Sequence, residues 1–225
     1  LVEGVRIEGR DPEPVGRVKG DLRMADVLAR AVRDRQRPLR KDLRVPFGVR
    51  SLWLTVEQSA HIVKEARRRF RTHNGARRFV EHEVFAALAA SHPLDDVDAE
   101  QVRERVRDTD EVREALAWMW PILTPAQLLH DLFGSRALLR SAARGRFADH
   151  EIDLLHRPRE GRAEDVVWTD SDVALLDEAR ELLGSRPGKK QQEAIRTYGH
   201  IVVDEAQDLS PMELRMLTRR SLNGS

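Results

Sequence analysis

The sequence contains no cysteine among its 225 residues. A disulfide framework, a thiolate zinc site and redox chemistry at cysteine are therefore excluded. The sequence also lacks any apolar run near the roughly 18 residues that a membrane-spanning helix needs. It begins Leu1-Val2-Glu3-Gly4, with neither a charged leader nor an apolar signal segment, so we expect a cytoplasmic chain with no membrane partner.

Neither sign of charge is in excess, because 39 lysine and arginine residues stand against 38 aspartate and glutamate residues. Nucleic-acid binders draw much of their affinity from clustered basic charge, so the whole-chain balance does not indicate one. Any contact with a polyanion must be local. One local candidate is the arginine run 67–69 with Arg71, Arg77 and Arg78, although charge on a helix is more often a solvated face.

Several patterns of known sites are missing as well. No serine sits in a Gly-x-Ser-x-Gly turn, so a serine hydrolase is unsupported. The eight histidines show no metal-binding spacing, since His150 and His156 lack a supporting cluster. Core packing is favoured over base stacking for the tryptophans, because each lies beside aliphatic residues. The four are Trp53, Trp118, Trp120 and Trp168.

Most of the chain is predicted to be helical. Apolar residues recur at helical spacing over residues 21–35. Capping boxes begin further helices at Thr55, Thr124 and Ser210, where Gln or Glu follows three positions later. We also expect Asn74 to cap a helix that runs to about residue 90. Additional helices are expected over residues 98–107, 110–120, 135–143, 149–155 and 173–183.

The predicted strand content is small. Residues 43–47 and 51–56 alternate with period two around Gly48, a pattern typical of a short hairpin, and Pro46 restricts the first strand to an edge. The apolar run His200-Ile201-Val202-Val203 is typical of a buried strand in a parallel sheet. Such sheets bind ligands at the carboxyl ends of their strands.

Two adjacent carboxylates, Asp204 and Glu205, follow this apolar run. A carboxylate at a strand end can hold Mg²⁺, usually through water, and a second one can accept a proton from the water that attacks a γ-phosphate. Asp204 fits the first role and Glu205 the second. The capping box at Ser210 then begins a helix, so strand, acidic loop and helix follow in the order that a nucleotide site needs.

Residues 201–208, Ile-Val-Val-Asp-Glu-Ala-Gln-Asp, resemble the Walker B element, motif II, of UvrD-like superfamily-1 helicases, with six consecutive matching positions. The resemblance implies that the chain acts on ATP with Mg²⁺. It implies Glu205 as the catalytic base and Asp204 as the magnesium ligand, with Gln207 coupling the nucleotide to the motor and Asp208 supporting the loop. The alternative is a strand end that simply dips into solvent.

The sequence contains no Gly-x-x-x-x-Gly-Lys-Ser/Thr loop, which would cradle the β- and γ-phosphates. Gly188-Lys189-Lys190 does not substitute, because it has no following hydroxyl and no second glycine at the right spacing. In UvrD-like motors motif II lies downstream of that loop. We therefore expect a segment of a larger motor, whose parent chain supplies Walker A and a second RecA-like domain. Alone, the segment should not hydrolyse ATP.

Further stretches resemble the actinobacterial HelD family of helicase-like factors that bind RNA polymerase. These are residues 20–25, 33–37, 120–125, 168–169, 175–179 and 196–200. This resemblance implies an ATP-driven factor that helps to release RNA polymerase from nucleic acid. It also implies a loop before motif II, here a short one over residues 184–195, that reaches toward the polymerase active centre. The alternative is a DNA helicase of the UvrD or helicase IV kind.

The predicted fold is a mostly α inserted domain with a small β hairpin, joined to part of a RecA-like α/β P-loop NTPase domain. We place the inserted domain at residues 1–186 and the motor part at residues 187–225. Two functional hypotheses follow for this region. It is either part of a polymerase-associated ATPase motor, or purely a protein-binding module whose ATPase belongs to the rest of the parent chain.

Overall fold

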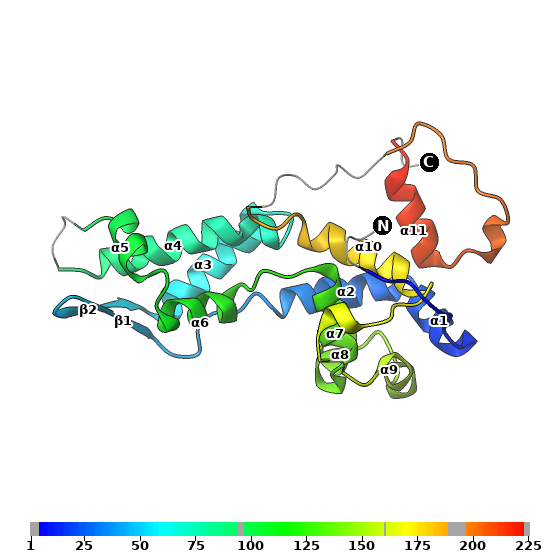
Figure 1. The fold of residues 1–225 in the computed structure, drawn as a ribbon, viewed down its shortest axis with the longest axis horizontal. Helices are drawn as coiled ribbons and strands as arrows, with labels where there is room; N and C mark the ends of the chain where they lie inside the picture. Colours follow the sequence, from blue (N-terminus) through cyan, green and yellow to red (C-terminus); the bar gives the residue numbers. More distant parts are fainter. Residues whose placement is uncertain (1–4, 94–96, 160, 189–196, 223–225) are drawn as a thin grey trace. The chain divides into compact units, whose positions relative to one another are not determined.

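A computed structural model of the chain describes residues 5–93, 97–159, 161–188 and 197–222. Within these ranges the fold has eleven α-helices and one two-stranded antiparallel hairpin (Figure 1). The predicted mostly helical fold with a small hairpin is therefore confirmed. None of the described helices has the length and apolar character that a bilayer crossing requires. The first four residues and most of the predicted loop at 184–195 lie outside the described residues.

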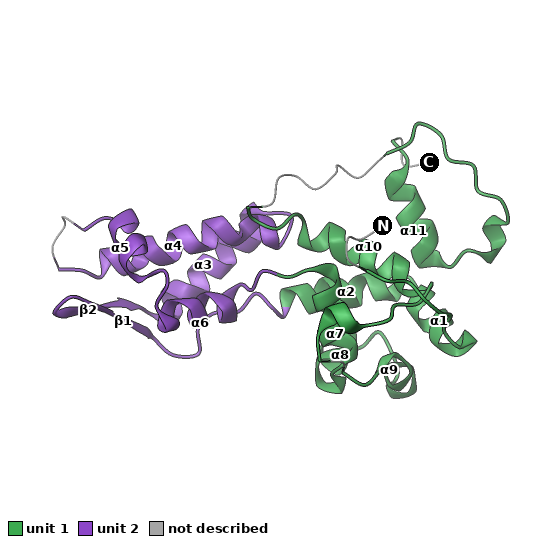
Figure 2. Ribbon diagram, viewed as in Figure 1, with its two compact units in different colours: residues 1–33, 123–225 green, residues 34–122 purple. Residues whose placement is uncertain are grey.

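The chain forms two compact units (Figure 2). Unit 1 contains residues 1–33 and 123–225, and unit 2 contains residues 34–122. Unit 2 is therefore an insertion in the sequence of unit 1.

The predicted boundary between residues 186 and 187 is a different division of the chain, and it stays a prediction. Residues 189–196, which follow that boundary, are not among those described. The last helix, α11 (Pro211–Arg220), packs against α10 (Asp172–Leu183) and belongs to unit 1. The segment after motif II therefore shares its packing with the helical region before it.

Unit 1 is a helical unit in which α10 packs against α2, α7 and α11. Its remaining helices are α1 (Glu13–Gly20), α2 (Arg23–Arg33), α7 (Pro125–Phe133), α8 (Arg136–Ala143) and α9 (Asp149–Leu155), with 3-10 turns η2 (Ala163–Asp165) and η3 (Ala206–Asp208). Leu175 and Met24 are fully buried in its core. Trp168 is buried beside them and forms an isolated parallel bridge with Ile7.

Charged side chains lie inside unit 1. Lys19 is 4% exposed, and its ammonium lies 2.8 Å from a carboxylate oxygen of Asp11 and 2.8 Å from one of Asp172. The hydroxyl of Thr169 donates to Asp11 at 2.6 Å. Burial by itself would raise the pKa of Asp11, but the hydrogen bonds from Lys19 and Thr169 outweigh it and the pKa is lowered. The lysine thus ties α1 to the start of α10.

Unit 2 packs α4 against α3, α5 and the hairpin. Its elements are β1 (Leu43–Phe47), β2 (Arg50–Leu54), α3 (Val56–Arg69), η1 (Asn74–Ala76), α4 (Arg77–Ala90), α5 (Ala99–Val106) and α6 (Asp110–Met119). Gly48 takes φ 62° at the hairpin turn, a backbone conformation that costs glycine little. The predicted hairpin is confirmed, with Val45 paired to Leu52 in the antiparallel register.

A neutral histidine lies in the core of unit 2. His73 is 2% exposed and its ring stacks on Trp120, with the centroids 5.1 Å apart. One ring nitrogen lies 2.6 Å from the carbonyl oxygen of Pro121 and the other lies 3.3 Å from the side-chain nitrogen of Gln36. The neutral tautomer with the proton on Nε2 satisfies both contacts. Burial lowers the pKa of His73 to about 4, and the positive charge of Arg77 acts in the same direction.

The local predictions succeed where one short pattern is enough to form the structure. Capping boxes are present at Thr55, Thr124 and Ser210, as predicted. The Asn74 cap is wrong, because Asn74 lies in η1 and α4 begins three residues later without a side-chain cap. Helix α1 was not predicted, although proline at its first turn is a usual start signal.

Candidate functional site

The motif II segment is an exposed loop in unit 1. Residues 201–203 form no strand, and Val202 is 81% exposed. The predicted buried strand at 200–203 is therefore wrong for this structure. A strand needs neighbouring strands to satisfy its backbone N–H and C=O groups. In the described part of the chain, the named strands are only β1 and β2, which pair with each other in unit 2.

The predicted site residues come together at a tight turn. The backbone N–H of Glu205 donates to Oδ1 of Asp204 at 3.0 Å, and the Gln207 side-chain amide donates to the Glu205 carboxylate. Glu205 has φ 52°, which is left-handed and disfavoured for a residue with a Cβ. Asp208 contributes its backbone N–H, which donates to the carbonyl of Glu205 at 2.9 Å. The turn presents both acidic side chains to solvent.

The helix that follows motif II begins where the sequence predicts. The hydroxyl of Ser210 accepts the N–H of Glu213, and the Glu213 carboxylate accepts the N–H of Ser210 at 2.7 Å. Ser210 also lies against the end of α1, where a Cβ added at Gly20 would come within 2.5 Å of the Ser210 Cβ. Only glycine fits there without a shift of one of the two segments.

Buried ion pairs hold α11 on α10. The Glu178 carboxylate is 4% exposed and accepts hydrogen bonds from Arg215, at 2.8 Å, and from Arg219. Asp177 pairs with Arg219 at 2.7 Å and also with Arg220. Burial would raise the pKa of Glu178, but the two arginines outweigh it and the pKa is lowered. The residues after the motif II loop are therefore fixed to the helical body of unit 1.

The donor chemistry of the loop suits a magnesium ion only in part. Mg²⁺ is commonly held by one or two carboxylates, several waters and substrate phosphates, and Asp204 offers an exposed carboxylate of that kind. Among the residues that the structure describes, no group of three or more acidic or histidine side chains is arranged to hold a metal ion. A metal at Asp204 would thus take its other ligands from water and a bound nucleotide.

The predicted arginine patch is largely engaged within unit 2. Arg68 and Arg69 both pair with Glu65, at 2.7 Å and 3.2 Å. Arg67 donates to the side chain of Gln36 at 3.0 Å. Arg77 is 11% exposed and pairs with Glu81 at 2.6 Å. These contacts favour the reading of a solvated, internally paired helix face over that of a nucleic-acid surface.

The tryptophans divide into two kinds. Trp120 and Trp168 are 1% exposed and pack in the cores of unit 2 and unit 1, as predicted. Trp118 is half-buried and donates its indole N–H to the carbonyl of Pro38 at 2.9 Å. Trp53 is 45% exposed on β2, so the packing prediction is wrong for that residue.

Comparisons with models of protein families and with curated proteins found no match to this chain. One pocket in unit 2 was missed by the sequence reasoning. Its arginines come from helices that are separate in the sequence, so no spacing pattern connects them.

Proposed function

We propose that this chain is a segment of an ATP-driven, UvrD-like motor that binds RNA polymerase and helps to release it from nucleic acid. The observation that carries the proposal is the six-residue match to motif II, Val-Asp-Glu-Ala-Gln-Asp at residues 203–208. In this proposal the segment from residue 187 onward belongs to a RecA-like domain. The rest of the parent chain supplies the phosphate loop.

The roles of the loop residues follow from their chemistry. Mg²⁺, held through water at Asp204, would neutralise the phosphate charge of ATP. Glu205 would accept the proton of the attacking water, and Gln207, which donates to Glu205, would orient that carboxylate. The fixed position of α11 supports this assignment, because Arg215 ties the helix after the loop to Glu178. A change in the loop would therefore reach the helical body directly.

The polymerase partner is supported by the HelD-like stretches, and the alternative remains a DNA helicase of the UvrD or helicase IV type. Both alternatives need motif II, so the motif cannot separate them. They differ in what stimulates hydrolysis. A polymerase-associated motor responds to RNA polymerase, whereas a DNA helicase responds to DNA and unwinds a duplex.

Glu205→Gln in the parent protein tests the proposal. The amide keeps the size of the side chain but cannot accept the proton, so we expect ATP hydrolysis to fall by roughly 100-fold or more, with nucleotide binding retained. Hydrolysis is measured alone, with RNA polymerase and with duplex DNA. Glu111→Gln, an exposed carboxylate on α6, is the matched control and should leave the rate unchanged.

Near-normal turnover by Glu205→Gln would remove the catalytic assignment. Stimulation by DNA alone, together with duplex unwinding, would favour the helicase alternative. Stimulation by RNA polymerase without unwinding supports the proposed motor.

A further inference from the structure

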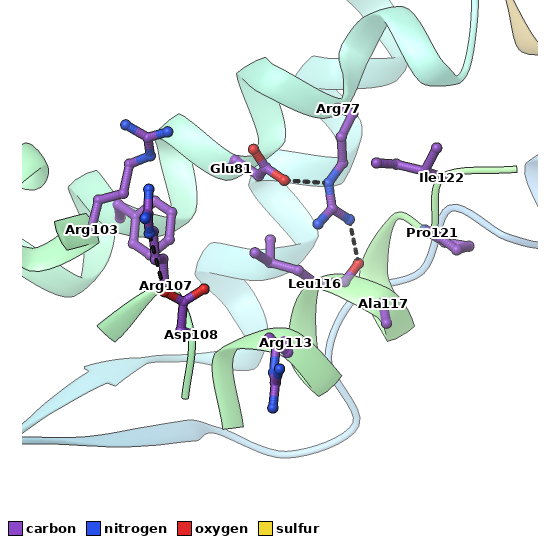
Figure 3. A pocket seen from close by; sticks show the side chains of 11 residues that line it. Arg77, Glu81, Arg103, Arg107, Asp108, Arg113, Leu116, Ala117, Pro121 and Ile122 are labelled. Atoms are coloured by element: carbon purple, nitrogen blue, oxygen red, sulfur yellow. Dashed lines mark hydrogen bonds and ion pairs between the residues drawn. The ribbon is translucent and has the colours of Figure 1, made fainter. Parts of the chain in front are cut away.

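A pocket of about 480 Å³ lies within unit 2 and is lined by residues of α4, α5, α6 and the segment after α6 (Figure 3). Its volume falls in the range of sites that bind small ligands or short peptide segments. Part of the lining is apolar, with Phe85 and Leu116 3% and 5% exposed. Ile122 adds an apolar side chain that is 43% exposed. A ligand would therefore meet apolar surface as well as charge.

Positive charge dominates the polar part of the lining. Four arginines stand against two carboxylates, which gives a net charge of +2. The arginines are Arg77, Arg103, Arg107 and Arg113, and the carboxylates are Glu81 and Asp108. Charge of this sign in a partly apolar pocket attracts an anionic ligand.

Arg77 and Glu81 form the fixed part of this pocket. Arg77 is 11% exposed, pairs with Glu81 at 2.6 Å and donates to the carbonyl of Leu116 at 2.8 Å. These bonds, drawn in Figure 3, connect α4 to α6 and cancel one charge of each sign. The net charge that a ligand meets thus comes from the remaining arginines.

The remaining arginines are held only by exposed carboxylates. Arg103 pairs with Glu100 at 2.7 Å and Arg113 with Asp110 at 2.5 Å, and these two carboxylates are 64% and 81% exposed. Arg107 lies 3.3 Å from Asp108, which is 83% exposed. Exposed pairs of this kind contribute about 0 to 1 kcal/mol each, so a partly desolvated anion can replace them.

We propose that this pocket binds a short acidic segment of a partner protein, in which an apolar residue lies next to carboxylates. Carboxylates would pair with Arg103 and Arg113, whose guanidinium groups suit two-point contact. The apolar residue would pack against the exposed side of Ile122. Interleaved carboxylates and a buried Phe85 make the pocket a poor track for nucleic acid, which needs continuous basic charge and open aromatic faces. This site lies in unit 2 and does not depend on motif II.

A labelled peptide, Asp-Leu-Glu-Phe-Asp, tests the proposal by fluorescence anisotropy with the full 225-residue chain. The uncharged peptide Asn-Leu-Gln-Phe-Asn and an oligothymidine strand are the comparison probes. We expect the acidic peptide to bind, the uncharged one to bind at least tenfold more weakly, and the double variant Arg103→Ala, Arg113→Ala to lose at least tenfold in affinity for the acidic peptide. Both arginines are exposed at the surface, and thermal melting checks that the variant folds.

Arg68→Ala is the matched control. Arg68 is 68% exposed and pairs with Glu65 at 2.7 Å, three residues away, as Arg103 pairs with Glu100. The control should stay within twofold of the original affinity. Absence of acidic-peptide binding, an equal loss in the control, or preference for the oligothymidine strand through the same two arginines would each overturn the proposal.

Discussion

The two units bury different kinds of polar group. In unit 1 the buried polar side chains include Lys19, Asp172, Asp177 and Glu178, which carry charge and are paired. Among the described residues of unit 2, the buried polar side chains are Ser59, His73 and Asn74. These are neutral at pH 7, since the pKa of His73 is about 4.

The difference shows two ways of fixing a helical core. A buried ion pair carries a large desolvation cost, so it favours the one arrangement in which both partners meet. In unit 1 such pairs join distant parts of the sequence, for example Lys19 to Asp172 and Glu178 to Arg219. Unit 2 uses hydrogen bonds to backbone carbonyls, such as that of Trp120 to His73, which carry no net charge. The two units should therefore respond differently to loss of a partner and to acid.

Lys19→Met is expected to have the largest effect on stability. It removes the cation but leaves the carboxylate of Asp172, which is 0% exposed, in the core. Removing one partner of a buried pair costs about 3 to 5 kcal/mol, so unit 1 should lose that much free energy of unfolding. Urea titration followed by ¹⁹F signals of labelled tryptophans measures it, because Trp168 reports on unit 1 and Trp120 on unit 2.

The control for this variant is Lys64→Met, at an exposed lysine on α3. It should change the free energy of unfolding by less than about 0.5 kcal/mol. A loss below about 1 kcal/mol in Lys19→Met would contradict the contrast between the units, because it would mean that the buried charges of unit 1 are not interdependent.

His73 should make unit 2 sensitive to mild acid. Its pKa is about 4 in the folded state and about 6.5 in the unfolded chain. The unfolded state therefore binds more protons between these values. The stabilisation is complete above pH 6.5 and is lost as the pH falls toward 4. The full shift corresponds to roughly 3 kcal/mol.

Urea unfolding at intervals from pH 7 to pH 4.5, followed through the Trp120 signal, measures this dependence. His73→Gln should flatten it, because glutamine does not titrate and retains a donor for the carbonyl of Pro121. An equally steep slope in His73→Gln would show that other groups cause the acid sensitivity. The Trp168 signal of the same samples serves as the comparison from unit 1.

The sequence predicted what short patterns determine. Thr55 and Gln58 lie three residues apart, so their capping box forms without help from the rest of the chain. The strand at 200–203 could not be predicted in this way, because its formation depends on partner strands. The pairing of Lys19 with Asp172 and the meeting of Arg103 with Arg113 depend on tertiary packing, which leaves no local pattern. The turn around Glu205 was predicted as an acidic loop, but its left-handed backbone was not.

The smallest expected effects come from Thr55→Ala in unit 2 and Thr124→Ala in unit 1. The two capping boxes are chemically identical: each threonine hydroxyl accepts the N–H of a glutamine at 3.1 Å, and each glutamine carbonyl accepts the N–H of its threonine. Each variant should cost about 1 kcal/mol, since one N–H at the helix start loses its acceptor. The same ¹⁹F-detected urea titration measures both.

The matched pair separates local from tertiary stabilisation. Equal losses, within about 0.5 kcal/mol, would mean that the units share the same local helix energetics. Their contrast then lies in the buried polar groups alone. A loss in one variant more than about 1 kcal/mol larger than in the other would break the comparison, because the cap itself would then depend on the core behind it.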